Sequence, residues 1–168
     1  VKQKKDRHKI NNLNAENSLY EAIAPVNKSP RFVYTHFLLP HHPYYFDSSG
    51  KEKIYNKKID NYPEEKTDYI QYLIYTNKKL LTIIDHIQKN TKTPPIIILL
   101  SDHGYRQFTD TSMKQYQVNT LNAVFLPNGN YNGFYENMSH VNLFRVLLNS
   151  QFGQNFPILK DSVIILDL

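Results

Sequence analysis

Two short stretches of the sequence carry side chains that could do chemistry. The first is Ser101-Asp102-His103-Gly104, in which a carboxylate and an imidazole stand on adjacent residues. Both can bind one divalent ion if the chain turns at that point, and Gly104 would permit the turn. The alternative is that Asp102 caps the segment that follows it and that His103 is an incidental polar residue.

The second stretch is Pro40-His41-His42-Pro43-Tyr44, with His36 five residues before His41. The prolines restrict the backbone, so an imidazole between them has little entropy left to lose on binding. Such an imidazole can bind a metal or form a hydrogen bond with a phosphoryl or sulfuryl oxygen. We assign a function to His41 and an exposed turn to His42. His36 stays open between a functional residue and a satisfied core histidine.

Each stretch follows a segment with the pattern of a buried strand. Residues 32–39 are apolar, aromatic or β-branched on both alternating faces, and Pro40 ends the run. Ile96–Leu100 is a short, fully apolar run directly before Ser101. Because the carboxyl ends of strands in open α/β sheets border the ligand crevice, both stretches are expected at its rim.

A helix connects these two strands. Apolar positions recur at steps of three and four residues from Asp68 to Lys89, which is typical of an amphipathic helix. Strand, helix and strand form one βαβ unit, whose crossover is expected to be right-handed. We therefore predict an α/β fold with a mostly parallel sheet flanked by helices, in one compact unit.

Further elements are expected on either side of this unit. They are a polar loop with one short helix at residues 1–30, an exposed loop at 47–65, a third strand at 121–127, a helix at 141–149 and a tail at 150–168 with a last strand at 163–168. Ser139 is a candidate N-cap for the helix. His140 stands at this helix start and is a further site candidate, with a cap or surface residue as the alternative.

The composition limits the function classes. The chain has 168 residues, enough for one ordinary domain, and no cysteine, which excludes disulfides, thiolate metal sites and a cysteine nucleophile. Its net charge of +5 comes mostly from scattered lysines, and no nucleic-acid-binding module is recognisable. We therefore expect no nucleic-acid partner. The charge is compatible with anionic substrates or lipid head groups.

With both stretches in view, the chain resembles the sulfatase and alkaline phosphatase superfamily over roughly residues 31–149. Within it, the chain is similar to membrane-tethered bacterial members such as lipoteichoic-acid synthases and phosphoethanolamine transferases. Residues 101–104 match the metal-binding motif, and residues 40–44 resemble a His-x-Pro-aromatic element of that family. The distance from His36 to His41 repeats a spacing seen in the phosphoethanolamine transferases.

The resemblance implies an alkaline phosphatase-like fold, of which residues 1–168 would be the C-terminal part of the catalytic domain. Asp102 and His103 would be ligands of a divalent metal, Zn²⁺ or Mn²⁺, with Ca²⁺ as a further candidate. His41 would be catalytic, contacting the transferred group or a second metal. Substrates would be sulfuryl or phosphoryl esters on an anionic small molecule, a glycan or a lipid head group. The location would be extracytoplasmic, periplasmic or cell-surface, with a membrane anchor in a missing N-terminal segment.

The sequence departs from the family pattern in two places. The hydroxyl nucleophile and an acidic ligand precede the segment seen here, and nothing in residues 1–30 matches them, so the fragment alone is expected to be inactive. Gln115 stands where the phosphoethanolamine transferases place another histidine. The alternative function is a non-catalytic α/β domain that binds a sulfated or phosphorylated glycan or lipid head group, and a nucleic-acid binder ranks last.

Overall fold

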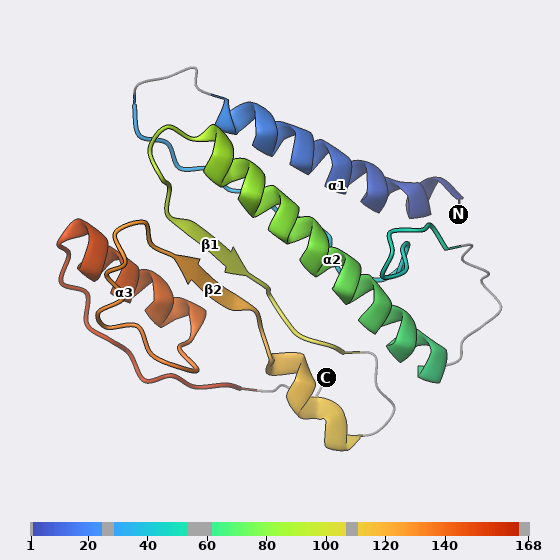
Figure 1. The fold of residues 1–168 in the computed structure, drawn as a ribbon. Coiled ribbons are helices and arrows are strands. Elements are labelled where there is room, and N and C mark those ends of the chain that lie inside the picture. Colours follow the sequence, from blue (N-terminus) through green and yellow to red (C-terminus); the bar gives the residue numbers. More distant parts are fainter. Residues whose placement is uncertain (1, 25–28, 54–61, 107–110, 165–168) are drawn as a thin grey trace. The chain divides into compact units, whose positions relative to one another are not determined.

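The structure is a computed structural model that describes residues 2–24, 29–53, 62–106 and 111–164 (Figure 1). In chain order its elements are α1 (Lys2–Ile23), α2 (Tyr62–Asn90), β1 (Ile97–Leu100), the 3-10 helix η1 (Thr111–Val118), β2 (Asn122–Phe125) and α3 (His140–Phe152). The chain divides into two compact units, Val1–Pro94 and Pro95–Leu168, where the sequence predicted one. Helices and strands are both present, which confirms a mixed α/β class.

The first unit contains a long N-terminal helix, α1, where the sequence predicted a loop with one short helix. α1 and α2 lie side by side and run in the same direction, and the segment from residue 29 runs back alongside them (Figure 1). The prediction of a loop with one short helix for residues 1–30 is therefore wrong. α1 has no broad apolar stripe: its buried side chains, among those described, are Asn12 and Ile23.

The core of this unit is aromatic. α2 confirms the helix predicted at 68–89 and begins six residues earlier, at Tyr62. It places Tyr72, which is fully buried, against Tyr44 and Tyr45. The rings of Tyr72 and Tyr75 are parallel, with centroids 5.9 Å apart. This packing fixes the segment that follows His41 and His42 along the chain, because Tyr44 and Tyr45 come directly after Pro43.

The predicted strand at 32–39 is an extended segment without a β-ladder. At Leu38 the backbone is held by a side chain instead: its N–H donates to Asn12 Oδ1 at 2.6 Å, and Asn12 Nδ2 donates to its carbonyl at 3.3 Å. An asparagine amide carries one donor group and one acceptor, so it satisfies both backbone groups of one residue as a neighbouring strand would. At Leu38 the neighbour of this segment is therefore α1 and not a strand.

The loop predicted at 47–65 is only partly described. A turn at residues 47–50 is stabilised by the Asp47 carboxylate, which accepts hydrogen bonds from the N–H groups of Ser49 and Lys51 at 2.9 and 3.0 Å. Residues 54–61 lie outside the described part, and α2 occupies the end of the predicted loop.

In the second unit, β1 and β2 confirm two predicted strands but pair antiparallel, with Ile97 opposite Phe125 and Leu100 opposite Asn122. Among the described residues this two-stranded ladder replaces the mostly parallel sheet that the sequence predicted. The physical reason is the connection: parallel neighbours need a crossover, whereas here η1 leads the chain back to an antiparallel neighbour of β1.

α3 confirms the predicted helix and its N-cap. Ser139 has extended backbone angles (φ −67°, ψ 154°), and its side chain accepts a hydrogen bond from the N–H of Asn142. Gly153 ends the helix in the left-handed conformation (φ 63°). The buried side chains of Met138, Leu143 and Val146 form the core of this unit, with Ile98, Val124 and Phe134 packed against them.

The tail after α3 is extended and bonded to the helix. Asn142, which is fully buried, donates to the Leu159 carbonyl at 2.7 Å and accepts from its N–H at 3.0 Å. Asn149 forms the same pair of bonds with Phe156, at 2.9 and 2.7 Å. Residues 163–164 are not in a strand, contrary to prediction, and residues 165–168 lie outside the described part.

Candidate functional site

The Asp102–His103 pair lies on a loop that is held at both ends. On one side, the Ser101 N–H donates to the Leu121 carbonyl at 3.1 Å, and the Leu121 N–H donates to Ser101 Oγ at 2.7 Å. On the other side, the Gly104 N–H donates to the Gln117 carbonyl at 2.8 Å. The two residues between these anchors are therefore presented in a defined conformation directly after β1.

Gly104 is required by close packing. A Cβ atom at this position would lie 2.0 Å from the Tyr116 carbonyl oxygen and 2.7 Å from that of Asn119. Its φ angle is not among the positive values found at other glycines, so the left-handed turn is not the reason for glycine here. The glycine was expected to permit a turn, and its role is instead to admit the backbone of η1 next to the Asp102–His103 loop.

The ring of His103 is oriented as a metal ligand requires. Its Nδ1 lies 2.6 Å from the Gly104 carbonyl oxygen. Because a carbonyl only accepts, Nδ1 carries the proton, and in the neutral ring Nε2 keeps a lone pair. A hydrogen bond from the second ring nitrogen to a backbone carbonyl is the usual support of a metal-binding histidine.

The two proposed donor atoms lie close enough to share an ion. His103 Nε2 is 3.8 Å from Asp102 Oδ2, and the Asp102 side chain is 85% exposed. Ligand bonds of about 2.0–2.2 Å in a tetrahedral site place two donors about 3.4 Å apart. A small rotation of the exposed carboxylate closes that difference. The oxygen and nitrogen donor set suits Zn²⁺ or Mn²⁺.

Within the described residues, no group of three or more His, Cys, Asp or Glu side chains is arranged to hold a metal ion. A metal ion at this loop would therefore have at most two ligands in this pair, Asp102 and His103. The His103 main-chain N–H also donates to Asp102 Oδ1 at 3.0 Å, which leaves Oδ2 as the oxygen facing the imidazole. The pair fits part of a divalent-metal site.

His41, in the first unit, shows the same ring orientation as His103. Its Nδ1 lies 2.5 Å from the His42 carbonyl oxygen, so Nε2 is the atom that a ligand can reach. The side chain is exposed. The His8 ring of α1 lies edge-on to it, with centroids 5.5 Å apart and an interplanar angle of 75°. His42 is half-buried, where the sequence indicated an exposed turn, and its ring lies edge-on to Tyr44 at 5.3 Å.

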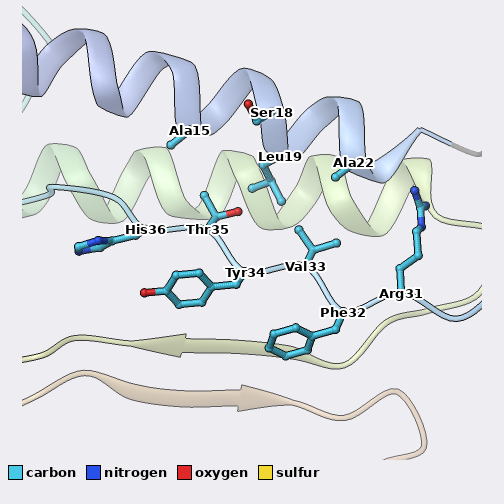
Figure 2. Close-up of a pocket in the computed structure, with 10 residues that line it drawn as sticks. All are labelled: Ala15, Ser18, Leu19, Ala22, Arg31, Phe32, Val33, Tyr34, Thr35 and His36. Carbon is cyan, nitrogen blue, oxygen red and sulfur yellow. The ribbon is translucent and has the colours of Figure 1, made fainter.

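His36 borders a groove of about 560 Å³ between α1 and residues 31–36 (Figure 2). Figure 2 shows Val33 and Thr35 pointing toward α1, and Phe32 and Tyr34 pointing away from it. His36 is exposed, so the interpretation as a core histidine does not hold within the described unit. The α1 side of the groove is lined by Ala15, Ser18, Leu19 and Ala22.

The structure brings some of the predicted residues together and describes others separately. Asp102 and His103 are adjacent, and His140 contacts the residue that anchors their loop, because its Nε2 lies 3.3 Å from the Leu121 carbonyl oxygen. The three candidates near Pro40 belong to the other compact unit. The contact of His8 with His41 was not predicted, because the helix α1 that carries His8 was not predicted. The sequence signal for that helix was the absence of glycine and proline from residues 1–24.

Comparison with protein-family models matches residues 5–149 to the model described as Sulfatase. The chain belongs to the sulfatase family. The match begins within α1, so it extends further toward the N-terminus than the resemblance at residues 31–149. No curated protein and no solved structure matched the chain.

Sulfatase-family membership implies a sulfatase-type enzyme with an alkaline phosphatase-like fold, of which this chain shows a mixed α/β part. It also implies a divalent metal and sulfated or phosphorylated ester substrates. The described helices include none that is long and apolar enough to cross a membrane.

Proposed function

We propose that this sulfatase-family chain supplies Asp102 and His103 as two ligands of a divalent metal in an enzyme that hydrolyses or transfers a sulfuryl or phosphoryl ester. The observation that carries the proposal is the 3.8 Å distance between Asp102 Oδ2 and His103 Nε2, with Nδ1 of the same ring bonded to Gly104. An exposed carboxylate and a lone pair of fixed direction together form a two-donor half-site.

A divalent ion bound there would activate a hydroxyl nucleophile and neutralise charge on the oxygens of the transferred group. In this proposal Asp102 contributes the negative charge and His103 the directed nitrogen. For His41 we propose a catalytic role on the strength of its motif, with Nε2 as the ring nitrogen that a ligand can reach. The nucleophile would come from a part of the protein outside this chain, so the chain alone would not turn over.

The finer assignment follows the motifs. The sequence around His41 and Asp102 supports a membrane-tethered bacterial enzyme of the lipoteichoic-acid synthase or phosphoethanolamine transferase kind. Such an enzyme would act outside the cytoplasm on an anionic small molecule, a glycan or a lipid head group. The net charge of +5 is consistent with an anionic substrate.

The direct test is calorimetric titration of Zn²⁺, Mn²⁺ and Ca²⁺ into the chain and into an Asp102→Ala, His103→Ala variant. The chain contains its own matched control, because Asp85 and His86 are another adjacent Asp-His pair. That pair lies within α2, where adjacent residues do not face each other and cannot share an ion. An Asp85→Ala, His86→Ala variant therefore also loses one carboxylate and one imidazole, but leaves the proposed site intact.

We expect one saturable site that is lost in the Asp102, His103 variant and retained in the Asp85, His86 variant. Circular dichroism of each variant checks that the helices remain. Equal binding by the chain and the Asp102, His103 variant would refute the ligand assignment. A loss of binding in the control variant as well would show nonspecific binding by surface carboxylates and imidazoles.

A further inference from the structure

We infer that His140 is a positioning residue for the Asp102–His103 pair: it holds the Leu121 carbonyl, which in turn holds Ser101 beside the pair. The link to metal binding rests on the proposed function, whereas the link to the conformation of the loop stands on the contacts alone. The sequence made His140 a candidate site residue, whereas its contacts assign it the role of supporting the loop next to the site.

Three hydrogen bonds meet at Leu121. Its carbonyl oxygen accepts from the Ser101 N–H at 3.1 Å and lies 3.3 Å from His140 Nε2. Its N–H donates to Ser101 Oγ at 2.7 Å. A backbone carbonyl has two lone pairs, so both contacts to the oxygen can form together. Since that oxygen only accepts, His140 donates from Nε2, the atom that a metal would otherwise use.

His140 is well placed to act as an anchor because the start of α3 is fixed. It is the first residue of the helix, directly after the N-cap Ser139. The Ser139 N–H donates to Asp161 Oδ1 at 2.9 Å. One turn further on, Leu143 is buried in the core against which Ile98 of β1 packs. The imidazole therefore projects from a rigid position onto Leu121.

The same junction offers a matched control. Asn122 Nδ2 donates to the Met138 carbonyl at 3.0 Å, so it also joins the start of β2 to the segment before α3. This bond does not involve the Leu121 carbonyl. Removing the Asn122 side chain weakens the contact between β2 and the segment before α3 in general. Removing the His140 side chain acts on the Leu121 carbonyl oxygen, which accepts the hydrogen bond from the Ser101 N–H.

The experiment compares the chain with His140→Ala, His140→Gln and Asn122→Ala variants. Amide hydrogen exchange measured by NMR reports on the Ser101 and Leu121 N–H groups, and calorimetry reports the Zn²⁺ dissociation constant. Glutamine retains an N–H donor at about the reach of Nε2. We expect His140→Ala to speed exchange at both amides about fivefold and to raise the Zn²⁺ dissociation constant by a similar factor, the effect of one partly exposed hydrogen bond. The His140→Gln variant should return both the amide exchange rates and the Zn²⁺ dissociation constant close to those of the unmodified chain.

Each other outcome overturns the inference. Unchanged exchange in His140→Ala means that the contact does not hold Leu121. A glutamine variant no better than alanine means that ring packing, not the N–H donor, matters, and an equal effect of Asn122→Ala means a general loosening. Loss of Zn²⁺ binding as complete as in the Asp102, His103 variant makes His140 a ligand. If the chain alone binds no metal, the calorimetric readout is lost, and amide exchange still decides the role of His140.

Discussion

Replacing Gly104 by alanine should displace the metal-binding pair, because the added methyl group has no space. Its Cβ would lie 2.0 Å from the Tyr116 carbonyl oxygen, whereas ordinary contact begins at 3.4 Å. The atoms must therefore separate by about 1.4 Å, which is 3.4 minus 2.0. The obstructing atom belongs to the backbone, so no side-chain rotation relieves the clash.

The cost can be estimated from what must move. Adding a methylene-sized group to a well-packed site costs about 1–3 kcal/mol. Relief by separating the two segments also breaks the hydrogen bond from Gly104 N–H to the Gln117 carbonyl, at 2.8 Å, which adds about 1 kcal/mol. We expect Gly104→Ala to lower the free energy of unfolding by about 3 kcal/mol. A shift of more than 0.5 Å at a ligand loop should also weaken Zn²⁺ binding by about tenfold or more.

The assay is urea unfolding followed by circular dichroism, together with calorimetric titration of Zn²⁺. Gly129→Ala is the matched control: an added Cβ there meets nothing within 4 Å, but the residue has a φ of +66°. Alanine in that conformation costs about 1–2 kcal/mol through backbone strain and leaves the metal site unchanged. The comparison separates a steric clash at the site from the general cost of replacing a glycine.

Two results would refute this account of Gly104. One is an alanine variant that is no less stable than Gly129→Ala, which would mean that the clash with η1 costs no more than the backbone strain in that control. The other is a clear loss of stability with unchanged Zn²⁺ affinity. In that case the loop conformation and metal binding would be independent, and the support assigned to Gly104 would concern folding alone.

Three further predictions concern packing and hydrogen bonding within the two units. Tyr72→Phe should raise the free energy of unfolding by about 1 kcal/mol in urea, because this buried hydroxyl has no hydrogen-bond partner among the described residues; a decrease would show that it has one. Hydrogen bonds from Ser139 and Tyr135 lower the pKa of Asp161 to about 2, so its carboxylate stabilises the fold above about pH 4 and this contribution is lost as the pH falls toward 2. The melting temperature of Asp161→Asn should therefore lie below that of the wild type at pH 5 and approach it at pH 2, and a constant difference would contradict this. Asn149→Ala removes two bonds to Phe156 and should cost about 1–2 kcal/mol with faster exchange of the Phe156 amide, whereas unchanged exchange would show that other contacts hold the tail.

Local sequence patterns were sufficient for the elements that bury an apolar stripe. α3 combines a capping serine with buried positions at Leu143, Val146 and Leu147, so its start and its inner face were both predictable. α1 offered no such stripe, because one of its buried residues is an asparagine whose amide bonds to Leu38. A helix stabilised by a polar contact to a distant segment leaves no periodic signal.

Of the candidate site, the sequence predicted the two proposed ligands but not the residues that support them. Asp102 and His103 are adjacent, so the sequence shows the pair directly. Their supports come from further along the chain: Tyr116 beside Gly104, and Leu121 beside Ser101. Close approach between such segments depends on how η1 turns the chain back, which no local pattern records.

The same reasoning explains why strands were easier to locate than to pair. An apolar run such as Ile97–Leu100 reports that a segment prefers burial, but its direction relative to a neighbour is set by the connection between them. Residues 32–39 are apolar on both faces and were expected in a ladder, yet within the described unit Val33, which points toward α1, is still 43% exposed, and Phe32 and Tyr34 are 85% and 77% exposed. Apolar side chains on both faces indicate that a segment can be buried on both sides. They do not specify which element lies beside it, and here the contact at Leu38 is an asparagine of α1.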